Sequence, residues 1–232
     1  FPFEKKYFDK ENIQSTFTGH PLLENDEKSK IDISQIIRDH KKIISIFSGS
    51  RQSEIDILLP ILIDFIKMMN EKYKDIFYVF HSTSELNRLV QDKLIKQGFK
   101  NCGSISDEKI KSQVLKSSIF AVAKSGTISL EICNAKVPSI IIYKMNSINF
   151  LIVKMLVKVK YANIINIAAN EEIIPELLQS NCNSKNIFNK VDSFFENNQS
   201  MQNQIDKSQE VIKNFKTNQS SKIAASVLIS SF

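Results

Sequence analysis

The feature that most limits the possible folds is a regular alternation of short apolar runs and longer helical patterns between residues 41 and 143. The apolar runs are expected to form strands over residues 41–47, 76–80, 119–123 and 139–143. The segments between them, whose apolar residues recur at helical spacing, are expected to form helices over residues 54–73, 85–97, 107–116 and 128–135. Strands that alternate with helices run parallel and are joined by right-handed crossovers. The pattern therefore predicts a Rossmann-like, doubly wound α/β domain with a parallel sheet.

The segments on either side of this alternation divide the chain into three parts. Residues 12–19 are expected to form a short strand that ends at Gly19-His20-Pro21. After about Asn146 the alternation stops, and the remainder is expected to be mainly helical, closing with residues 183–232. The expected parts are residues 1–22, a Rossmann-like domain over residues 23–180, and a helical C-terminal extension over residues 181–232.

Two short glycine loops stand where an expected strand ends and an expected helix begins. They are Ser48-Gly49-Ser50-Arg51 and Lys124-Ser125-Gly126-Thr127, in a chain that has only five glycines. In parallel α/β sheets, ligands bind outside the carboxyl ends of the strands, and the backbone N–H groups at the start of a helix favour an anion. We therefore expect these loops to bind the phosphates of a nucleotide.

The charge of the chain narrows the class of ligand. Its formal net charge of +6 comes from lysines spread along the expected helices, and its only arginines are Arg38, Arg51 and Arg88. The sequence has no arginine-rich or aromatic-interleaved patch of the kind that binds nucleic acid. A diffuse positive charge fits an anionic small molecule or an acidic membrane surface. No nucleic-acid partner is therefore expected.

The cysteines indicate neither a disulfide framework nor a zinc site. Cys102, Cys133 and Cys182 are odd in number, far apart and without Cys-x-x-Cys spacing. A reducing, cytoplasmic compartment is therefore expected.

Four short motifs, taken together, resemble those of one known family. In chain order they are His20-Pro21-Leu22, then Ser-Gly-Ser-Arg-Gln-Ser-Glu-Ile over residues 48–55, Ser-Gly-Thr-Ile-Ser-Leu-Glu over residues 125–131, and Asn166 with Pro-Glu-Leu-Leu-Gln over residues 175–179. Their order and spacing resemble the lipid-A-disaccharide synthases, from Phe1 to about residue 215. Motifs that occur in register are far more specific than any one of them alone.

The resemblance implies a GT-B glycosyltransferase, in which two Rossmann-like domains face each other across a cleft. It implies an inverting transfer of 2,3-diacylglucosamine from UDP-2,3-diacylglucosamine to 2,3-diacylglucosamine 1-phosphate, with release of UDP, in lipid A biosynthesis of Gram-negative bacteria. The reaction would take place on the cytoplasmic face of the inner membrane, with no cofactor and no metal. This chain would supply the donor-binding part, with residues 1–22 as the remnant of the joint to an N-terminal domain.

The start of the sequence bears on the catalytic base. The chain begins at Phe1 without Met, and Phe-Pro-Phe-Glu reads as the middle of a protein. We therefore expect an N-terminal part that is absent here. The resemblance places the general base in it, a carboxylate that takes the proton of the acceptor hydroxyl. On this interpretation the chain alone is inactive.

Two other hypotheses stay open. One is a different GT-B enzyme, such as a UDP-GlcNAc epimerase or the peptidoglycan N-acetylglucosaminyltransferase, against which the string over residues 48–55 argues. The other is a non-catalytic remnant of a split or decaying gene. An upstream coding sequence with an acceptor domain in frame would exclude the remnant.

The resemblance also assigns roles to the motif residues, each with a plainer alternative. Arg51 would offer its forked charge to two phosphate oxygens, or would only pair with Glu54 on its own helix. The loop 125–127 would donate hydrogen bonds and Glu131 would accept them from the two ribose hydroxyls, or these residues would only cap a helix. The donor-binding residues implied are Gly49, Ser50, Arg51, Ser125, Gly126, Thr127, Glu131, Asn166, Glu176 and Gln179.

The remaining motif residues are assigned by the resemblance alone. Asn166 and Gln179 would read uracil or hold a phosphate, and Glu176 would serve the sugar. His20 is interpreted as a turn-stabilising residue, with a cleft contact as the alternative. Glu171 stands where the family usually has a basic residue, and so places a negative charge near the donor phosphates.

A strongly apolar stretch over residues 148–159 is too short and too charged to cross a bilayer. Lys154 and Lys158 lie one helical turn apart within it. Two interpretations stay open: a buried or homodimer helix, and a surface helix that touches acyl chains while its lysines meet lipid phosphates.

Overall fold

The computed structural model of the chain describes residues 1–24, 32–37, 42–146, 160–217 and 219–230. Its strands are β1 (Lys42–Phe47), β2 (Ile76–His81), β3 (Cys102–Ile105), β4 (Phe120–Lys124), β5 (Ser139–Tyr143) and β6 (Glu176–Leu178). Its α-helices are α1 (Lys5–Lys10), α2 (Ser34–Ile37), α3 (Gln52–Lys72), α4 (Ser84–Lys96), α5 (Glu108–Lys116), α6 (Ile128–Asn134), α8 (Ile164–Ala169), α9 (Ser184–Glu196), α10 (Asn198–Lys213) and α11 (Ser220–Ser230). Short 3-10 helices are η1 (Pro2–Glu4), η2 (Pro21–Leu23) and η3 (Gln179–Asn181).

The strands form one parallel sheet in the order β3-β2-β1-β4-β5-β6. Ile44 of the central strand β1 pairs with Tyr78 of β2 on one side and with Phe120 of β4 on the other. The chain winds outward from β1 to β3, then returns to β4 and winds the other way. This order is that of the Rossmann fold, and it confirms the predicted α/β class.

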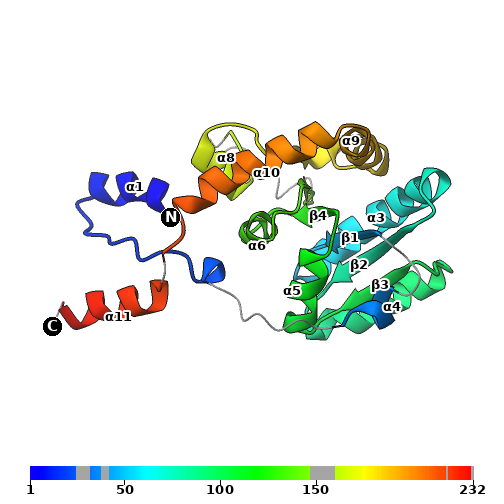
Figure 1. Ribbon diagram of the computed structural model, residues 1–232, viewed down its shortest axis with the longest axis horizontal. Coiled ribbons are helices and arrows are strands. Elements are labelled where there is room, and N and C mark those ends of the chain that lie inside the picture. Colours follow the sequence, from blue (N-terminus) through cyan, green and yellow to red (C-terminus); the bar gives the residue numbers. More distant parts are fainter. Residues whose placement is uncertain (25–31, 38–41, 147–159, 218, 231–232) are drawn as a thin grey trace.

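Helices cover both faces of this sheet, as Figure 1 shows. On one face α3, α4 and α9 pack on the strands, and Leu58 and Ile187 belong to the buried cluster that they form. On the other face α6, α8 and α10 bury Leu130, Ile165 and Ile212, and α5 packs beside them. The C-terminal helices α9 and α10 therefore complete opposite faces of the sheet.

The pattern of α3 shows how the sequence specifies this layer. Its buried side chains recur three or four residues apart, so they form one apolar stripe that faces the sheet. The stripe consists of Ile55, Leu58, Leu59, Leu62, Ile63, Phe65, Ile66 and Met69. Each such side chain contributes about 1.5–3 kcal/mol when it leaves water. Because the stripe fixes α3 on the sheet, it also fixes the loop that precedes α3.

The structure corrects the sequence-based expectation in two places. The strand expected over residues 12–19 is wrong, because the structure gives this segment no place in the sheet. The expectation of a mainly helical remainder after Asn146 left out β6, a three-residue strand that adds to the edge of the sheet. In addition, β3 was not predicted, since Gly103 and Ser104 interrupt its short apolar pattern.

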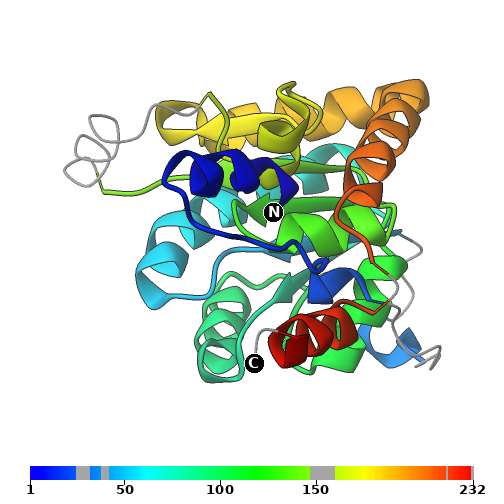
Figure 2. The same ribbon diagram turned by 90° about the vertical axis from the view of Figure 1, so that its left-hand side faces the viewer.

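The segment 12–19 instead leads into contacts with the C-terminal part of the chain. Gly19 has a φ of +92°, and a Cβ there would collide with Thr217. The His20 N–H donates to the carbonyl of Phe215 over 3.0 Å, and Phe1 stacks on the His20 ring. These contacts hold the two end segments of the sequence together, and α1 and α11 lie on the same side of the molecule in Figures 1 and 2.

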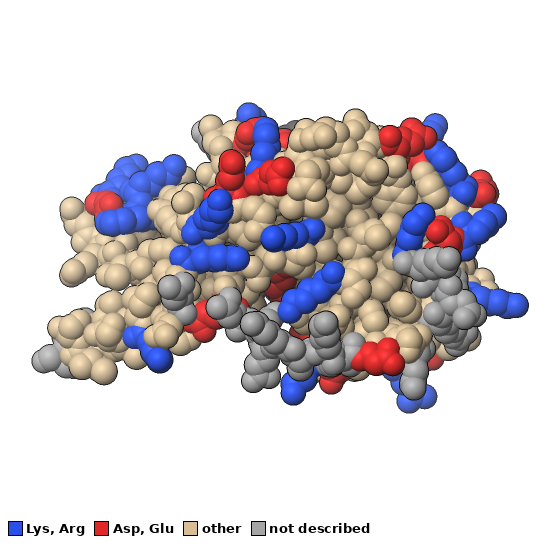
Figure 3. All heavy atoms as spheres, in the orientation of Figure 1, with Lys and Arg blue, Asp and Glu red and all other residues tan. Residues whose placement is uncertain are grey.

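The surface carries charges of both signs. On the face shown in Figure 3, Lys and Arg side chains are interspersed with Asp and Glu. Within the described ranges, no helix combines the length and the apolar character needed to span a bilayer. Residues 148–159, for which two interpretations were given, lie outside the described residues.

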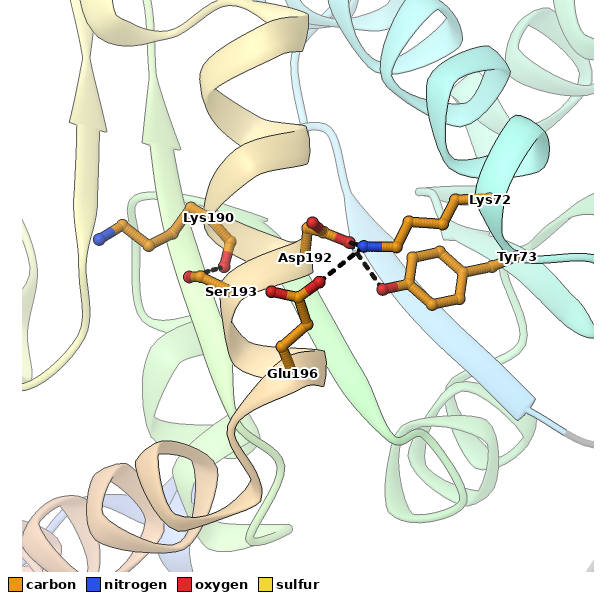
Figure 4. Close-up of polar contacts among 6 residues, drawn as sticks. All are labelled: Lys72, Tyr73, Lys190, Asp192, Ser193 and Glu196. Atoms are coloured by element: carbon orange, nitrogen blue, oxygen red, sulfur yellow. Dashed lines mark hydrogen bonds and ion pairs between the residues drawn. The ribbon is translucent and has the colours of Figure 1, made fainter.

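A polar cluster, drawn in Figure 4, ties the end of α3 to α9. The Asp192 carboxylate accepts a hydrogen bond from the Tyr73 hydroxyl over 2.6 Å. It also forms an ion pair with the Lys72 ammonium over 2.6 Å. Lys72 also pairs with Glu196 over 2.8 Å. The bonds to Asp192 and then Glu196 raise the pKa of the Lys72 ammonium. Within α9, the Ser193 hydroxyl donates to the carbonyl of Lys190.

We predict that Tyr73→Phe lowers the free energy of unfolding by about 1 kcal/mol, the scale of a partly exposed hydrogen bond to a charged acceptor. The substitution keeps the edge contact of the ring with Phe195, at 5.3 Å between centroids. Urea denaturation measures the change. The matched control is Glu196→Gln, which should have almost no effect because that carboxylate is 64% exposed. Equal losses for the two variants would contradict the prediction.

Candidate functional site

A pocket of about 260 Å³ opens at the carboxyl ends of β1, β2 and β4. The strand order reverses between β1 and β4, so this is the place where doubly wound sheets bind their ligands. The first turns of α5 and α6 close its sides. Its volume lies just below the range for small-molecule sites, about 300–1,000 Å³.

The first glycine loop has a conformation that requires glycine. Gly49 has a φ of +113°, and a Cβ there would lie 2.8 Å from the Cβ of Glu54. The Ser50 N–H donates to the Glu54 carboxylate over 3.0 Å. The loop is thus folded back onto the first turn of α3. Gly49 and Ser50 both line the pocket, and their donor-binding role stays a prediction.

Glu54 also joins the first glycine loop to the second. Its carboxylate pairs with the Lys124 ammonium over 3.0 Å, and the two side chains are only 14% and 20% exposed. Burial would raise the pKa of the Glu54 carboxyl, but hydrogen bonds from Lys124 and the Ser50 N–H outweigh it and hold the pKa below its ordinary value of 4.5. Glu54 was quoted in the motif, but its bridging role was not predicted.

The second glycine loop is anchored by hydrogen bonds of Ser125, whereas Gly126 faces open space. The Ser125 hydroxyl donates to the carbonyl of Ala162 over 2.7 Å, and the Ser125 N–H donates to the carbonyl of Ile142. A Cβ at Gly126 would meet nothing within 4 Å, so this glycine faces open space. Thr127 occupies the N-cap position of α6, but its side chain forms no capping hydrogen bond. The hydroxyl of Thr127 therefore does not cap the helix, contrary to the plainer alternative. The loop and Glu131 line the pocket.

Other parts of the pocket wall come from α5 and from the end of β2. Lys111 of α5 pairs with Glu108 over 2.7 Å, and both line the pocket. His81 and Thr83 also line it, although the sequence analysis gave neither a role. No motif marked them, but a histidine at the carboxyl end of an expected buried strand is a signal that could have found His81.

Arg51 lies at the rim of this region. Its side chain is 77% exposed, and Nη1 pairs with Glu54 over 3.2 Å. The contact expected by the plainer alternative is therefore present. Arg51 is not among the residues that line the pocket, and its role with a phosphate stays a prediction.

Asn166 and Glu176 lie together, are not among the residues that line the pocket, and bind the chain itself. The buried Asn166 amide donates to the carbonyl of Ile174 over 2.7 Å and to Glu176 over 2.8 Å. The Glu176 carboxylate also accepts the N–H groups of Ala162 and Asn163. These contacts fix the segment that holds the second glycine loop from behind. The binding roles assigned to Asn166 and Glu176 remain predictions.

Gln179 and His20 are placed by local contacts. Gln179 has a φ of +52°, and its side-chain oxygen accepts the N–H of Met145 over 3.5 Å. Its Nε2 is buried with no partner among the described residues. The His20 ring accepts the N–H of Leu22 over 3.3 Å, which confirms its interpretation as a turn-stabilising residue. Glu171 forms an ion pair with Lys207.

The described residues contain no cluster of side chains suited to bind a metal ion. Among the residues that the structure describes, no three His, Cys, Asp or Glu side chains cluster as a metal ion requires. Cys133 is buried, and burial raises the pKa of its thiol to about 12. Such a thiol is inert at neutral pH.

Comparison with known sequences finds one family along almost the whole chain. The family model described as lipid-A-disaccharide synthetase matches residues 1–229. A lipid-A-disaccharide synthase of Rickettsia prowazekii (strain Madrid E) is 34% identical over 237 residues, which cover 100% of this chain and 62% of that protein. One of Sulfurihydrogenibium sp. (strain YO3AOP1) is 32% identical, over 83% of this chain and 54% of that protein. The chain thus spans 54–62% of these relatives.

Solved structures share the fold at low sequence identity. An S. aureus MnaA-UDP co-structure superposes with a TM-score of 0.59 and 14% identity, over 94% of this chain and 54% of that one. The structure of WaaG, a glycosyltransferase involved in lipopolysaccharide biosynthesis, gives a TM-score of 0.57 and 10% identity, over 94% of this chain and 56% of that one. These likenesses show a Rossmann-like fold shared with GT-B glycosyltransferases.

The depressed pKa of Glu54 predicts how the stability of the site depends on pH. A carboxyl whose folded pKa is lowered contributes stability above its unfolded pKa, and this contribution is lost as the pH falls through the folded value. We predict that Glu54→Gln lowers the free energy of unfolding by about 1–3 kcal/mol at pH 7, the scale of hydrogen bonds to a charged group. The difference from the unmodified protein should shrink as the pH falls below 4.5.

Urea denaturation of both proteins between pH 3 and pH 8, by about one unit per step, measures this dependence. Glu108→Gln is the matched control, because that carboxylate lines the same pocket but is 81% exposed. It should change stability little at any pH. A Glu54→Gln difference that stays constant into acid would show that the charge of Glu54 is not what stabilises the loops.

Proposed function

Because the chain belongs to the lipid-A-disaccharide synthetase family, we propose that its Rossmann-like domain binds the UDP-sugar donor of a glycosyl transfer. The observation that carries the proposal is the pocket at the reversal of the strand order, which both glycine loops line. Backbone N–H groups and hydroxyls of these loops suit phosphate oxygens. Lys124 and Lys111 also line the walls, each in an ion pair with a glutamate. The loops meet in one wall because Glu54 joins them.

In this proposal the loops act on the leaving group. As the glycosidic bond to the diphosphate breaks, negative charge builds on UDP, and donors fixed beforehand around the phosphates stabilise it. Gly49, the Ser50 hydroxyl, Gly126 and Thr127 would serve in this way, while Ser125 would hold the second loop in place through its bonds to Ala162 and Ile142. Glu131 would accept hydrogen bonds from ribose hydroxyls. Asn166 and Glu176 would contribute through the segment behind the second glycine loop, and Gln179 through its contact with Met145. Supporting this, the pocket takes in both loops and Glu131.

Arg51 would act as a mobile phosphate clamp. In its ion pair with Glu54, the Arg51 side chain is 77% exposed, and ion pairs of solvent-exposed side chains contribute little free energy. Little free energy is therefore lost when the guanidinium leaves Glu54 and turns toward a diphosphate, where it can form two parallel hydrogen bonds. Glu54 would keep its partner Lys124 in either state.

We further propose the family reaction for the full-length protein: inverting transfer of 2,3-diacylglucosamine from UDP to 2,3-diacylglucosamine 1-phosphate. The match to the family model supports it. The general base would come from the acceptor-binding part of the relatives, of which this chain spans 62% or less. Acyl chains on both substrates favour work in the cytoplasm at the inner membrane surface, and the net charge of +6 would attract anionic lipid headgroups. A homodimer is compatible with this proposal.

We predict that the chain binds UDP more tightly than AMP or GMP, as measured by titration calorimetry. Arg51→Ala should weaken UDP binding by about 1.5–3 kcal/mol, the scale of hydrogen bonds to a charged group. Arg88→Ala is the matched control, because Arg88 is an exposed arginine of α4 that does not line the pocket. Equal affinity for the three nucleotides, or equal effects of the two arginine variants, would refute the proposal.

The same titration tests the second loop through Gly126→Ala. The added methyl group meets nothing within 4 Å in the free protein, so the free energy of unfolding should not fall. If a phosphate approaches this backbone, the methyl group blocks it, and UDP affinity should fall about tenfold, or ~1.4 kcal/mol. Unchanged affinity would place the ligand elsewhere.

We also predict that residues 1–232 alone form no disaccharide from the labelled donor and acceptor, because no general base is supplied by this part. Addition of the acceptor-binding part of a relative should restore product formation. Release of UDP with disaccharide by residues 1–232 alone would contradict the proposed position of the base.

A further inference from the structure

His81 is a buried histidine in the wall of the pocket. It is the last residue of β2, is 4% exposed and lines the pocket. Its ring stacks on Phe47, with 4.1 Å between the ring centroids and 21° between the planes. The imidazole is therefore held in one orientation by its neighbours and by the strand.

A chain of hydroxyl groups fixes which nitrogen of this ring carries the proton. The Ser118 hydroxyl donates its one proton to the carbonyl of Val114 over 2.8 Å. The Ser118 oxygen must therefore accept a hydrogen bond from the Ser45 hydroxyl, over 2.7 Å. Because the Ser45 proton is used in this contact, Ser45 accepts from His81 Nε2 over 2.8 Å. A hydroxyl has only one proton to give, so Nε2 carries the imidazole proton.

The other nitrogen is then a bare acceptor. Burial, with a smaller effect of the Lys111 charge, lowers the pKa of His81 to about 3, so the ring is neutral at physiological pH. A neutral imidazole with its proton on Nε2 has a lone pair on Nδ1. Nδ1 is buried and has no hydrogen-bond partner among the described residues. The Thr83 hydroxyl, which lines the same pocket, is likewise buried and without a partner in the described part of the chain.

Two buried polar atoms without partners in one pocket require an explanation, because buried polar groups in proteins are almost always hydrogen-bonded. We propose that His81 is a specificity residue whose Nδ1 accepts a hydrogen bond from a hydroxyl or N–H group of the bound nucleotide. The inference rests on the proposed function, since it concerns the same pocket. The Thr83 hydroxyl would bind a polar atom of the same moiety.

This assignment separates the two ends of the ligand. A diphosphate carries acceptor oxygens and no proton on the bridging groups at neutral pH, so it cannot satisfy the Nδ1 lone pair. The donor must be a sugar hydroxyl, a ribose hydroxyl or the N3–H of uracil. The phosphates then lie toward Lys124 and the glycine loops, away from His81.

Two substitutions separate the two nitrogens. His81→Gln places an amide N–H near the position of Nε2, so it can keep the bond to Ser45 but supplies no acceptor in place of Nδ1. His81→Asn places its short amide near the position of Nδ1, so it can keep an acceptor there but not the bond to Ser45. Tyr78→Phe is the control, because it removes another buried hydroxyl of β2 that has no partner among the described residues and does not line the pocket.

The test is titration calorimetry of these proteins with UDP, 2′-deoxy-UDP, UDP methylated at uracil N3, and UDP-GlcNAc. We expect His81→Gln to weaken binding of the ligand that carries the donor about tenfold. His81→Asn should lose less, and Tyr78→Phe should lose nothing. The analogue that lacks the donor should bind the unmodified protein and His81→Gln equally. A loss with UDP-GlcNAc but not with UDP assigns the donor to the sugar.

Nitrogen-15 NMR of the imidazole gives a readout that needs no ligand. We expect a bare Nδ1 and a protonated Nε2 in the free protein, and a proton on Nδ1 would overturn the inference. If His81→Gln leaves the binding of both UDP and UDP-GlcNAc unchanged, or if binding falls more in His81→Asn than in His81→Gln, the inference is overturned and the proposed function stays intact. Absence of binding by the unmodified protein would overturn both.

Discussion

The carboxylate of Glu54 is the contact on which the candidate site depends. It accepts the N–H of Ser50 and pairs with Lys124, so it couples the loop after β1 to the end of β4. These two strands are neighbours in the sheet although the stretch from α3 to α5 separates them in sequence. Because the pair is mostly shielded from water, its geometry is more constraining than that of an exposed ion pair. Without it the two loops would be independent ends of two strands.

Around this pair, the structure divides its polar groups into two sets. Some hold the chain in place: Asn166 and Glu176 bind backbone groups and fix the segment behind the second loop, and Ser125 uses its hydroxyl for the same purpose. Others, such as His81 Nδ1, are buried at the pocket without partners among the described residues. A protein that folds stably can leave such atoms unpaired at the place where it binds a ligand, and the ligand completes their hydrogen bonds.

The sequence predicted the alternation and the two loops because both leave local signals. Long apolar strands such as residues 76–80 and amphipathic helices such as α3 have a clear period, and Gly49 is needed for its positive φ. Short elements leave weaker signals: β6 has only three residues, and β3 contains glycine and serine. His81 escaped notice because its significance depends on Ser45 and Ser118, which are brought beside it only by the packing of β1 and α5. The contact of residues 12–19 with the C-terminal part is of the same long-range kind.

The joining of the two end segments has a consequence for how the molecule opens. Thr217 donates to the carbonyl of Thr18, a residue 199 positions away, and Glu24 accepts the N–H of Ser221 at the start of α11. Contacts this distant in sequence form late, because a long loop must close first. The strands of the sheet are closer in sequence, so the sheet can form before the contacts between the end segments form. It can also persist after those contacts break. We therefore expect the end segments to detach from an intact sheet as one cooperative unit, and their amide hydrogens to exchange with solvent sooner than those of β1 and β4.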